Sequence, residues 1–158
     1  MDLSDLGELG KTLSYLVPVI ILILVNVFFK KQQEQKRRLA VIQSLLSEIN
    51  YNQKLMEGFL IQWQAKKFKT GIWKRNRDKM DYIDQSLHAT LVSAYEITDE
   101  FNREIDAAKE HKSASYLASI QVDRLREPLA RSKQRLEEWL QLNKGRKELA
   151  KEGGDSAP

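Results

Sequence analysis

The sequence predicts an all-α protein, in which an N-terminal transmembrane helix precedes an antiparallel three-helix bundle of long amphipathic helices. Residues 13–29 form an uncharged apolar stretch, and from Leu39 to Trp139 apolar residues recur at steps of three and four, as on amphipathic helices. No alternating pattern indicates a strand. The 158 residues leave room for one folded domain besides the span. The chain has no cysteine, which excludes disulfides, thiol catalysis and cysteine-based metal sites.

We expect residues 12–30 to cross a membrane as a helix. Residues 13–29 would form a helix about 26 Å long, just under the hydrocarbon thickness of ~30 Å, and flanking lysines can reach the headgroups. A cleaved signal peptide would begin with cations and end in small residues, whereas this chain begins with Asp2, Asp5 and Glu8. A buried core helix would seldom lack charge on every face over such a length.

Cations gather immediately after the span, at Lys30, Lys31, Lys36, Arg37 and Arg38. The positive-inside rule places this side of the membrane in the cytoplasm. We therefore expect a single-pass protein of the plasma membrane, with residues 1–11 as a short external N-terminus, residues 12–30 in contact with lipid, and residues 31–143 as a cytoplasmic helical bundle. The polar residues 144–158 end in Gly-Gly-Asp-Ser-Ala-Pro and are expected to form a disordered tail.

The first apolar stripe of the bundle consists of Leu39, Ile42, Leu46, Ile49, Met56, Leu60 and Trp63. We expect the helix that carries it to end at Thr70-Gly71, because only Gly58 disfavours helix before that point. The sequence leaves open whether this helix is continuous with the membrane span. Asn50, Asn52 and Gln53 lie beside the stripe, either as ordinary interfacial residues or as a buried amide that fixes the register between helices.

Two further stripes predict the other two helices. The second consists of Ile83, Leu87, Leu91, Ala94, Thr98, Phe101, Ile105 and Ala108, with Tyr95 and Ile97 beside it. Asp81 or Asp84 should cap its helix, which we expect to end near residues 111–113. The third consists of Leu117, Ala118, Val122, Leu125, Leu129, Ser132, Leu136 and Trp139. This stripe continues in phase across Pro128, so we expect a single, kinked helix.

The sequence offers no convergent set of reactive groups, so we expect neither catalysis nor a cofactor nor a bound metal. His88 and His111 stand in neither of the histidine motifs typical of helical metal sites. The second helix carries an acidic strip of Glu96, Asp99, Glu100, Glu104, Asp106 and Glu110. Such a strip is typical of a solvated face or of pairing with cations on a neighbouring helix.

The candidate partner-binding residues are Lys66, Lys67, Lys69, Trp73, Lys74, Arg75, Arg77 and Lys79, which form the densest basic segment of the chain. In one interpretation Ile72 and Trp73 turn inward and the lysines are solvated. In a second the segment docks an acidic protein partner, and in a third it binds nucleic acid or lipid. One tryptophan and one phenylalanine provide little of the stacking platform that single-stranded nucleic acid requires.

The motifs "LLSEINYN" (residues 45–52) and "LHATLVSAYEITDEFN" (residues 87–102), joined by a connector that contains Trp73, resemble small prokaryotic single-span helical proteins without assigned function. The resemblance covers residues 13–140 and implies a membrane anchor with a helical bundle and no active site. The expected function is that of a scaffold, adaptor or accessory subunit of a membrane complex, acting on a protein partner or a second copy. The alternative is a membrane-tethered nucleic-acid-binding protein that uses the basic segment.

Overall fold

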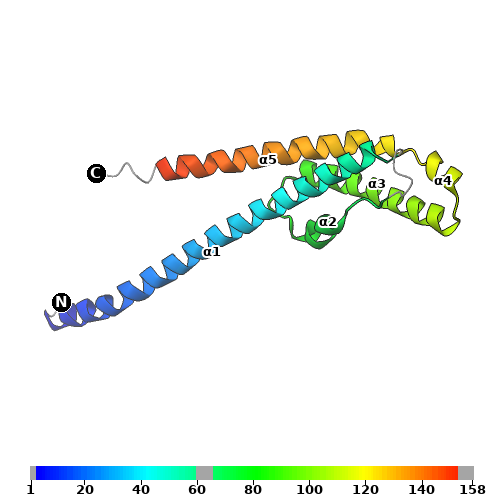
Figure 1. Cartoon of the computed structure of the whole chain (residues 1–158). Coiled ribbons are helices and arrows are strands. Elements are labelled where there is room, and N and C mark those ends of the chain that lie inside the picture. The colour runs from blue at the N-terminus through cyan, green and yellow to red at the C-terminus, as the bar shows by residue number, and fades with distance from the viewer. Residues whose placement is uncertain (1–2, 60–65, 153–158) are drawn as a thin grey trace. The chain divides into compact units, whose positions relative to one another are not determined.

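The computed structural model describes residues 3–59 and 66–152, with side chains described for residues 16–59 and 66–144. Its elements are α1 (Leu3–Glu57), α2 (Gly71–Asn76), the 3₁₀ turn η1 (Arg77–Lys79), α3 (Gln85–Glu110), α4 (Ala114–Ser119), the 3₁₀ turn η2 (Val122–Leu125) and α5 (Arg126–Glu152) (Figure 1). These described ranges contain helices and no strand, which confirms the predicted all-α class.

The chain divides into two compact units, Met1–Arg38 and Leu39–Pro158. The first unit contains the apolar part of α1, whose large hydrophobic side chains from Leu16 to Phe29 are all exposed, Leu22 by 69%. Within the described residues, α1 is the one helix long and apolar enough to cross a membrane, and its apolar part lies near the N-terminus.

The second unit has a hydrophobic core built from α1, α3, η2 and α5. Its fully buried aliphatic side chains are Ile42, Leu45 and Ile49 from α1, Leu87, Leu91 and Ile105 from α3, and Leu125, Leu129 and Leu136 from η2 and α5. Helix α3 packs along α5 and also contacts α4 and η2. Apolar burial of this kind supplies most of the free energy of folding of a small helical unit.

The second stripe is confirmed throughout, because all eight of its residues are buried. The Asp84 side chain caps α3 by accepting a hydrogen bond of 2.8 Å from the backbone N–H of Leu87. At the other end, the N–H groups of Lys112 and Ser113 donate to the carbonyls of Lys109 and Ala108. This is a Schellman motif, in which Lys112, with φ of 48°, occupies the left-handed position that glycine prefers.

The predicted end of the first helix at Thr70-Gly71 is wrong. Helix α1 ends at Glu57, and Gly58 and Phe59 close it with turn hydrogen bonds to the carbonyls of Lys54 and Met56. Glycine has a low helix propensity, and Phe59 turns into the core, where it stacks on Phe68 at 6.2 Å between ring centroids. Thr70 instead precedes α2 as its N-cap residue. Leu60 and Trp63 of the first stripe lie outside the described residues.

The prediction of one kinked third helix is also wrong, because the chain breaks between α4 and η2. Ile120 adopts an extended conformation, with φ of −68° and ψ of 115°, and it is buried together with Val122. Pro128 is the third residue of α5, where no helical hydrogen bond requires its missing N–H, so no kink is needed. Ala118, expected in the stripe, is exposed.

We expected residues 144–158 to be disordered. The structure differs for residues 144–152, because α5 remains helical to Glu152. Residues 144–152 include lysine, arginine, glutamate, leucine and alanine, which have high helix propensities. The rest of the expected tail, residues 153–158, lies outside the described residues.

Candidate functional site

The basic segment begins in a short non-helical stretch, residues 66–70, which we call the strap. Two asparagines from different helices bind it through paired hydrogen bonds. Asn52 of α1 bonds both the N–H and the carbonyl of Lys69, each at 2.7 Å, and Asn102 of α3 bonds both groups of Phe68, at 2.8 and 2.9 Å. In an extended chain, neighbouring residues direct their backbone polar groups to opposite sides. The strap therefore joins α1 to α3 as a strand joins its two neighbours in a sheet.

Of the amides beside the first stripe, Asn52 is a buried one, but it bonds to the strap and not to a neighbouring helix. Its side chain is fully buried, and both of its polar atoms are engaged by Lys69. A buried amide costs little free energy only when it is hydrogen-bonded. Asn52 thus fixes the position of the strap on α1.

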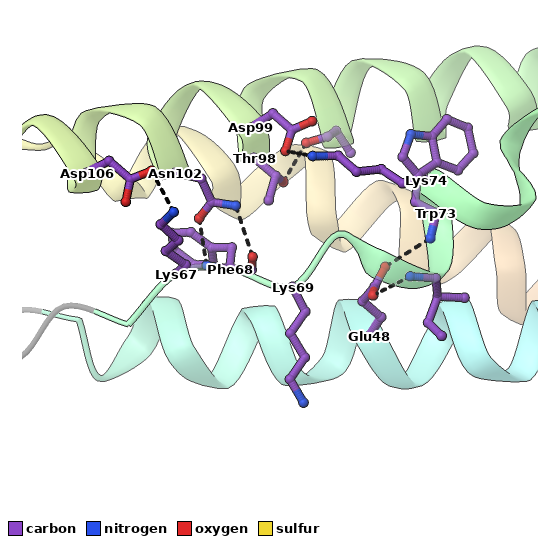
Figure 2. A network of polar contacts seen from close by, with 12 residues as sticks. Glu48, Lys67, Phe68, Lys69, Trp73, Lys74, Thr98, Asp99, Asn102 and Asp106 are labelled. Carbon is purple, nitrogen blue, oxygen red and sulfur yellow. Dashed lines mark hydrogen bonds and ion pairs between the residues drawn. The ribbon is translucent and has the colours of Figure 1, made fainter.

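Glu48 of α1 holds the next part of the segment. The backbone N–H groups of Ile72 and Trp73, in the first turn of α2, donate to its carboxylate at 2.8 and 3.3 Å (Figure 2). The Tyr95 hydroxyl donates to the same carboxylate at 2.9 Å. The side chain of Thr70 does not cap α2, so this distant carboxylate takes its place. Glu48 is only 6% exposed, and its three hydrogen bonds offset the cost of burying its charge.

Tyr95 completes this group on α3. Burial raises the pKa of its hydroxyl far above the ordinary value, and the neighbouring Glu48 carboxylate raises that pKa further. Its ring stacks on Trp73, with centroids 5.1 Å apart and ring planes within 7°. The prediction that Trp73 turns inward is confirmed, and Ile72 is partly buried beside it.

Some cations of the basic segment pair with the acidic strip of α3. Lys67 pairs with Asp106, and Lys74 lies 2.8 Å from Asp99, as Figure 2 shows. Each of these four side chains remains at least 31% exposed, so each pair contributes no more than about 1 kcal/mol to stability. The strip thus combines both expected features, a solvated face and pairing with cations of a neighbouring element.

Lys69 and Arg75 lie on another side of the segment. Lys69 extends away from α3 in Figure 2, and its Nζ lies 3.9 Å from the centroid of the Tyr51 ring on α1. The Nε of Arg75 donates to the carbonyl of Gly71 at 3.2 Å. Within the part of the chain that the structure describes, neither cation has an ion-pair partner.

The other predicted site residues are dispersed on the surface. Arg77 lies 3.3 Å from its neighbour Asp78, and Lys66 and Lys79 are exposed. Of the membrane-flanking cations, Lys30, Lys31, Lys36 and Arg37 are exposed along α1, and Arg38 pairs with Glu34 at 2.7 Å.

The two histidines are not brought together by the described fold in any metal-binding group. The His88 ring lies 5.7 Å from that of Trp73, and His111 is exposed at the end of α3. Among the described residues, no group of three histidine or acidic side chains could hold a metal ion.

Sequence reasoning missed Glu48 and Asn102 as organising residues. Both follow the helical spacing of the core: Glu48 lies between the buried Leu45 and Ile49, and Asn102 follows the buried Phe101. The sequence signal that could have identified them is a polar residue at a helix position where the pattern predicts a buried apolar one. Comparisons with known protein families, curated proteins and solved structures find no match for this chain.

Proposed function

We propose that the chain is a membrane-anchored helical scaffold, adaptor or accessory subunit that acts through protein–protein contacts. In this proposal residues 12–30 cross the plasma membrane once, residues 1–11 lie outside, and residues 31–143 form an antiparallel three-helix bundle in the cytoplasm. The observation that carries the proposal is an exposed apolar helical segment on a chain whose second unit has its own hydrophobic core.

The exposed apolar segment supports the membrane anchor. Soluble monomers rarely expose large contiguous apolar surfaces, because hydration of such surfaces is unfavourable. Every large hydrophobic side chain from Leu16 to Phe29 is at least 44% exposed, so none of them is part of a protein core in this fold. Lipid is the environment that such a helix suits. The cations that follow it favour the cytoplasmic placement of the C-terminal part.

Contacts among α1, α3 and α5 support the bundle. The α3–α5 packing and the bonds from Glu48 and Asn52 of α1 to Tyr95 and Lys69 join elements far apart in sequence.

The hydrogen bonds of the buried polar groups in the second unit support a binding role over a catalytic one. Its buried carboxylate, Glu48, and its perturbed hydroxyl, Tyr95, bind each other and the first turn of α2. Both groups therefore serve to position the basic segment. Exposed charges of both signs remain around that segment, and such charges give protein interfaces their specificity.

Two observations weigh against the nucleic-acid alternative. Trp73 stacks on Tyr95 inside the core, so its ring faces are not open to a base. Lys67 and Lys74 already face carboxylates, which reduces the attraction of the segment for phosphates. Retention of the full chain on DNA or RNA that falls steeply with salt, and is lost when Lys66, Lys67 and Lys69 become glutamine, would favour this alternative.

Purification of the tagged full chain from its native membranes tests the proposal. We expect the chain to stay in the membrane fraction after an alkaline wash and to co-purify with a protein partner or a second copy at fixed stoichiometry. A matched control replaces residues 12–30 by an unrelated single span and should retain the partner. Release by the alkaline wash, or purification as a monomer without partner, would contradict the proposal.

A further inference from the structure

A hollow of about 480 Å³ lies between α1 and the segment formed by the strap and α2. Its lining includes Ser44, Ser47 and Tyr51 from α1, Lys69 from the strap, and Ile72 and Arg75 from α2. Its volume falls within the range of about 300–1,000 Å³ that is typical of ligand sites. Lys69 and Arg75, which have no ion pair in the described fold and make a cation–π and a helix contact instead, both line this one hollow.

The arrangement of the strap separates the cations of the basic segment into two groups. The side-chain amide of Asn102 hydrogen-bonds the backbone of Phe68 and holds it toward α3. The side-chain amide of Asn52 does the same for Lys69 toward α1. Lys67 pairs with Asp106 on α3, whereas Lys69 lies over Tyr51 on α1. The cations beside α3 are therefore neutralised, and those at the hollow are not.

Glu48 also lines the hollow, but its carboxylate is already engaged. Its two oxygens accept from Ile72, Trp73 and Tyr95, and the side chain is almost fully buried. The exposed charges at the hollow are thus those of Lys69 and Arg75. An anionic group that enters meets two cations and no competing exposed carboxylate from the lining.

We propose that this hollow binds an acidic segment of a protein partner, with a glutamate or aspartate carboxylate between Lys69 and Arg75 and a neighbouring apolar side chain against Ile72 and Tyr51. The proposal rests on the adaptor function proposed above and names the chemistry of its partner. A peptide suits the hollow better than a lone phosphate does, because the volume far exceeds one anion and because Ile72 and the Tyr51 ring offer apolar surface. Arginine gives a carboxylate two parallel hydrogen bonds.

Fluorescence anisotropy with the full chain in nanodiscs of zwitterionic lipid tests the site. The probe is a labelled short peptide of alternating glutamate and valine, and its control has glutamine in place of glutamate. We expect binding of the glutamate peptide alone, weakened about tenfold in the double variant Lys69→Gln/Arg75→Gln, since exposed ion pairs contribute up to about 1 kcal/mol each. The matched variant Lys66→Gln/Lys79→Gln removes equal charge outside the hollow and should change Kd by less than about twofold.

A second pair of variants tests the shape of the site without changing charge. Ser47→Trp places a large ring in the hollow and should abolish peptide binding, whereas Gln43→Trp, on an exposed position of α1 outside the lining, should leave it unchanged. Both serine and glutamine here are exposed, so far-ultraviolet circular dichroism of the two variants should match that of the wild type.

Several outcomes would overturn the site. These are no binding of the glutamate peptide, equal weakening by both double variants, or binding of inorganic phosphate or phosphatidylserine vesicles with no binding of the peptide. Failure of the adaptor function would be distinct: the peptide would bind, yet the chain would purify from native membranes without a partner. Conversely, a native partner that survives Lys69→Gln/Arg75→Gln would leave the adaptor in place and reject the hollow as its contact.

Discussion

The Tyr95 hydroxyl of α3 donates a hydrogen bond of 2.9 Å to the Glu48 carboxylate of α1, across 47 residues of sequence. The same carboxylate holds the first turn of α2, and the Tyr95 ring lies flat against Trp73 of that helix. One carboxylate and one tyrosine thus tie three helices together at the basic segment.

This relationship predicts a loss of stability at high pH. Burial and Glu48 raise the pKa of Tyr95 in the folded state, whereas in the unfolded chain it titrates near 10. The stabilisation is complete below pH ~10 and falls as pH rises further, by up to about 1.4 kcal/mol per pH unit, because only the unfolded state then ionises. Chemical denaturation of the full chain in detergent, followed by circular dichroism between about pH 8 and pH 11, measures this.

The control for this prediction is Tyr95→Phe, which lacks the titrating group. At neutral pH it should cost about 1.5–3 kcal/mol, the usual contribution of a hydrogen bond to a charged group. The difference in unfolding free energy between wild type and Tyr95→Phe should then shrink above pH ~10. A difference that stays constant over this range would mean that the folded protein ionises Tyr95 as readily as the unfolded chain.

Removal of the Asn52 side-chain amide, which binds the strap, should release the strap locally. Asn52→Ala leaves the N–H and carbonyl of Lys69 without their partner, and we expect a cost of about 1–3 kcal/mol. Amide hydrogen exchange should speed up at Lys69 more than in the middle of α3, since strap opening is local. Asn50→Ala, on the same helix but outside these hydrogen bonds, is the matched control. It should change neither the unfolding free energy nor the exchange rate at Lys69. Unchanged exchange at Lys69 would show that Asn52 does not hold the strap.

Leu91 lies at the centre of the buried stripe of α3 and is fully buried. Leu91→Ala should lower the unfolding free energy by about 2–5 kcal/mol, from lost apolar burial and the cavity that remains. Lys79→Ala, on the exposed surface of η1, should change it by less than about 0.5 kcal/mol. Denaturant titration of the full chain measures both. A neutral Leu91→Ala in a chain that stays folded would disprove this packing.

Lys112 offers a stabilising substitution, because its φ of 48° suits glycine better than a residue with a side chain. Lys112→Gly should raise the unfolding free energy by about 0.5–1 kcal/mol. Arg103→Gly, an exposed position in the middle of α3, should instead lower it by about 1 kcal/mol. If glycine destabilises both positions alike, the Schellman motif is absent in solution.

Membrane orientation follows from the flanking cations. A reporter active only in the cytoplasm, fused after Pro158, should be active, and a reporter that requires export should be silent. Replacement of Lys30, Lys31, Lys36, Arg37 and Arg38 by glutamine should weaken this preference, because these charges set it. The opposite reporter pattern would place residues 31–143 outside the cell and reverse the proposed topology.

Helix α3 shows which features of the fold the local sequence pattern could predict. Its apolar stripe and its end near His111 were predicted, and Asp84 was one of two predicted caps, because helical periodicity and capping depend on residues a few positions apart. The apolar character of residues 13–29 was equally visible, since it is a property of composition. The inward position of Trp73 belonged to one of the three interpretations of the basic segment, and the structure confirms that position.

The tertiary structure alone decided where the strap lies, which cations are neutralised and where the first helix ends. Asn52 binds a backbone 17 residues away, Asn102 one 34 residues away, and Glu48 a hydroxyl 47 residues away. Such bonds satisfy backbone groups that secondary structure leaves open, and no periodicity marks them in advance. The sequence by itself determined the all-α class and the apolar face of α3, because these follow from composition and local spacing. The basic segment contacts α3 through Lys67 and Lys74 and α1 through Lys69 only in the folded chain, because these partners lie far from it in sequence.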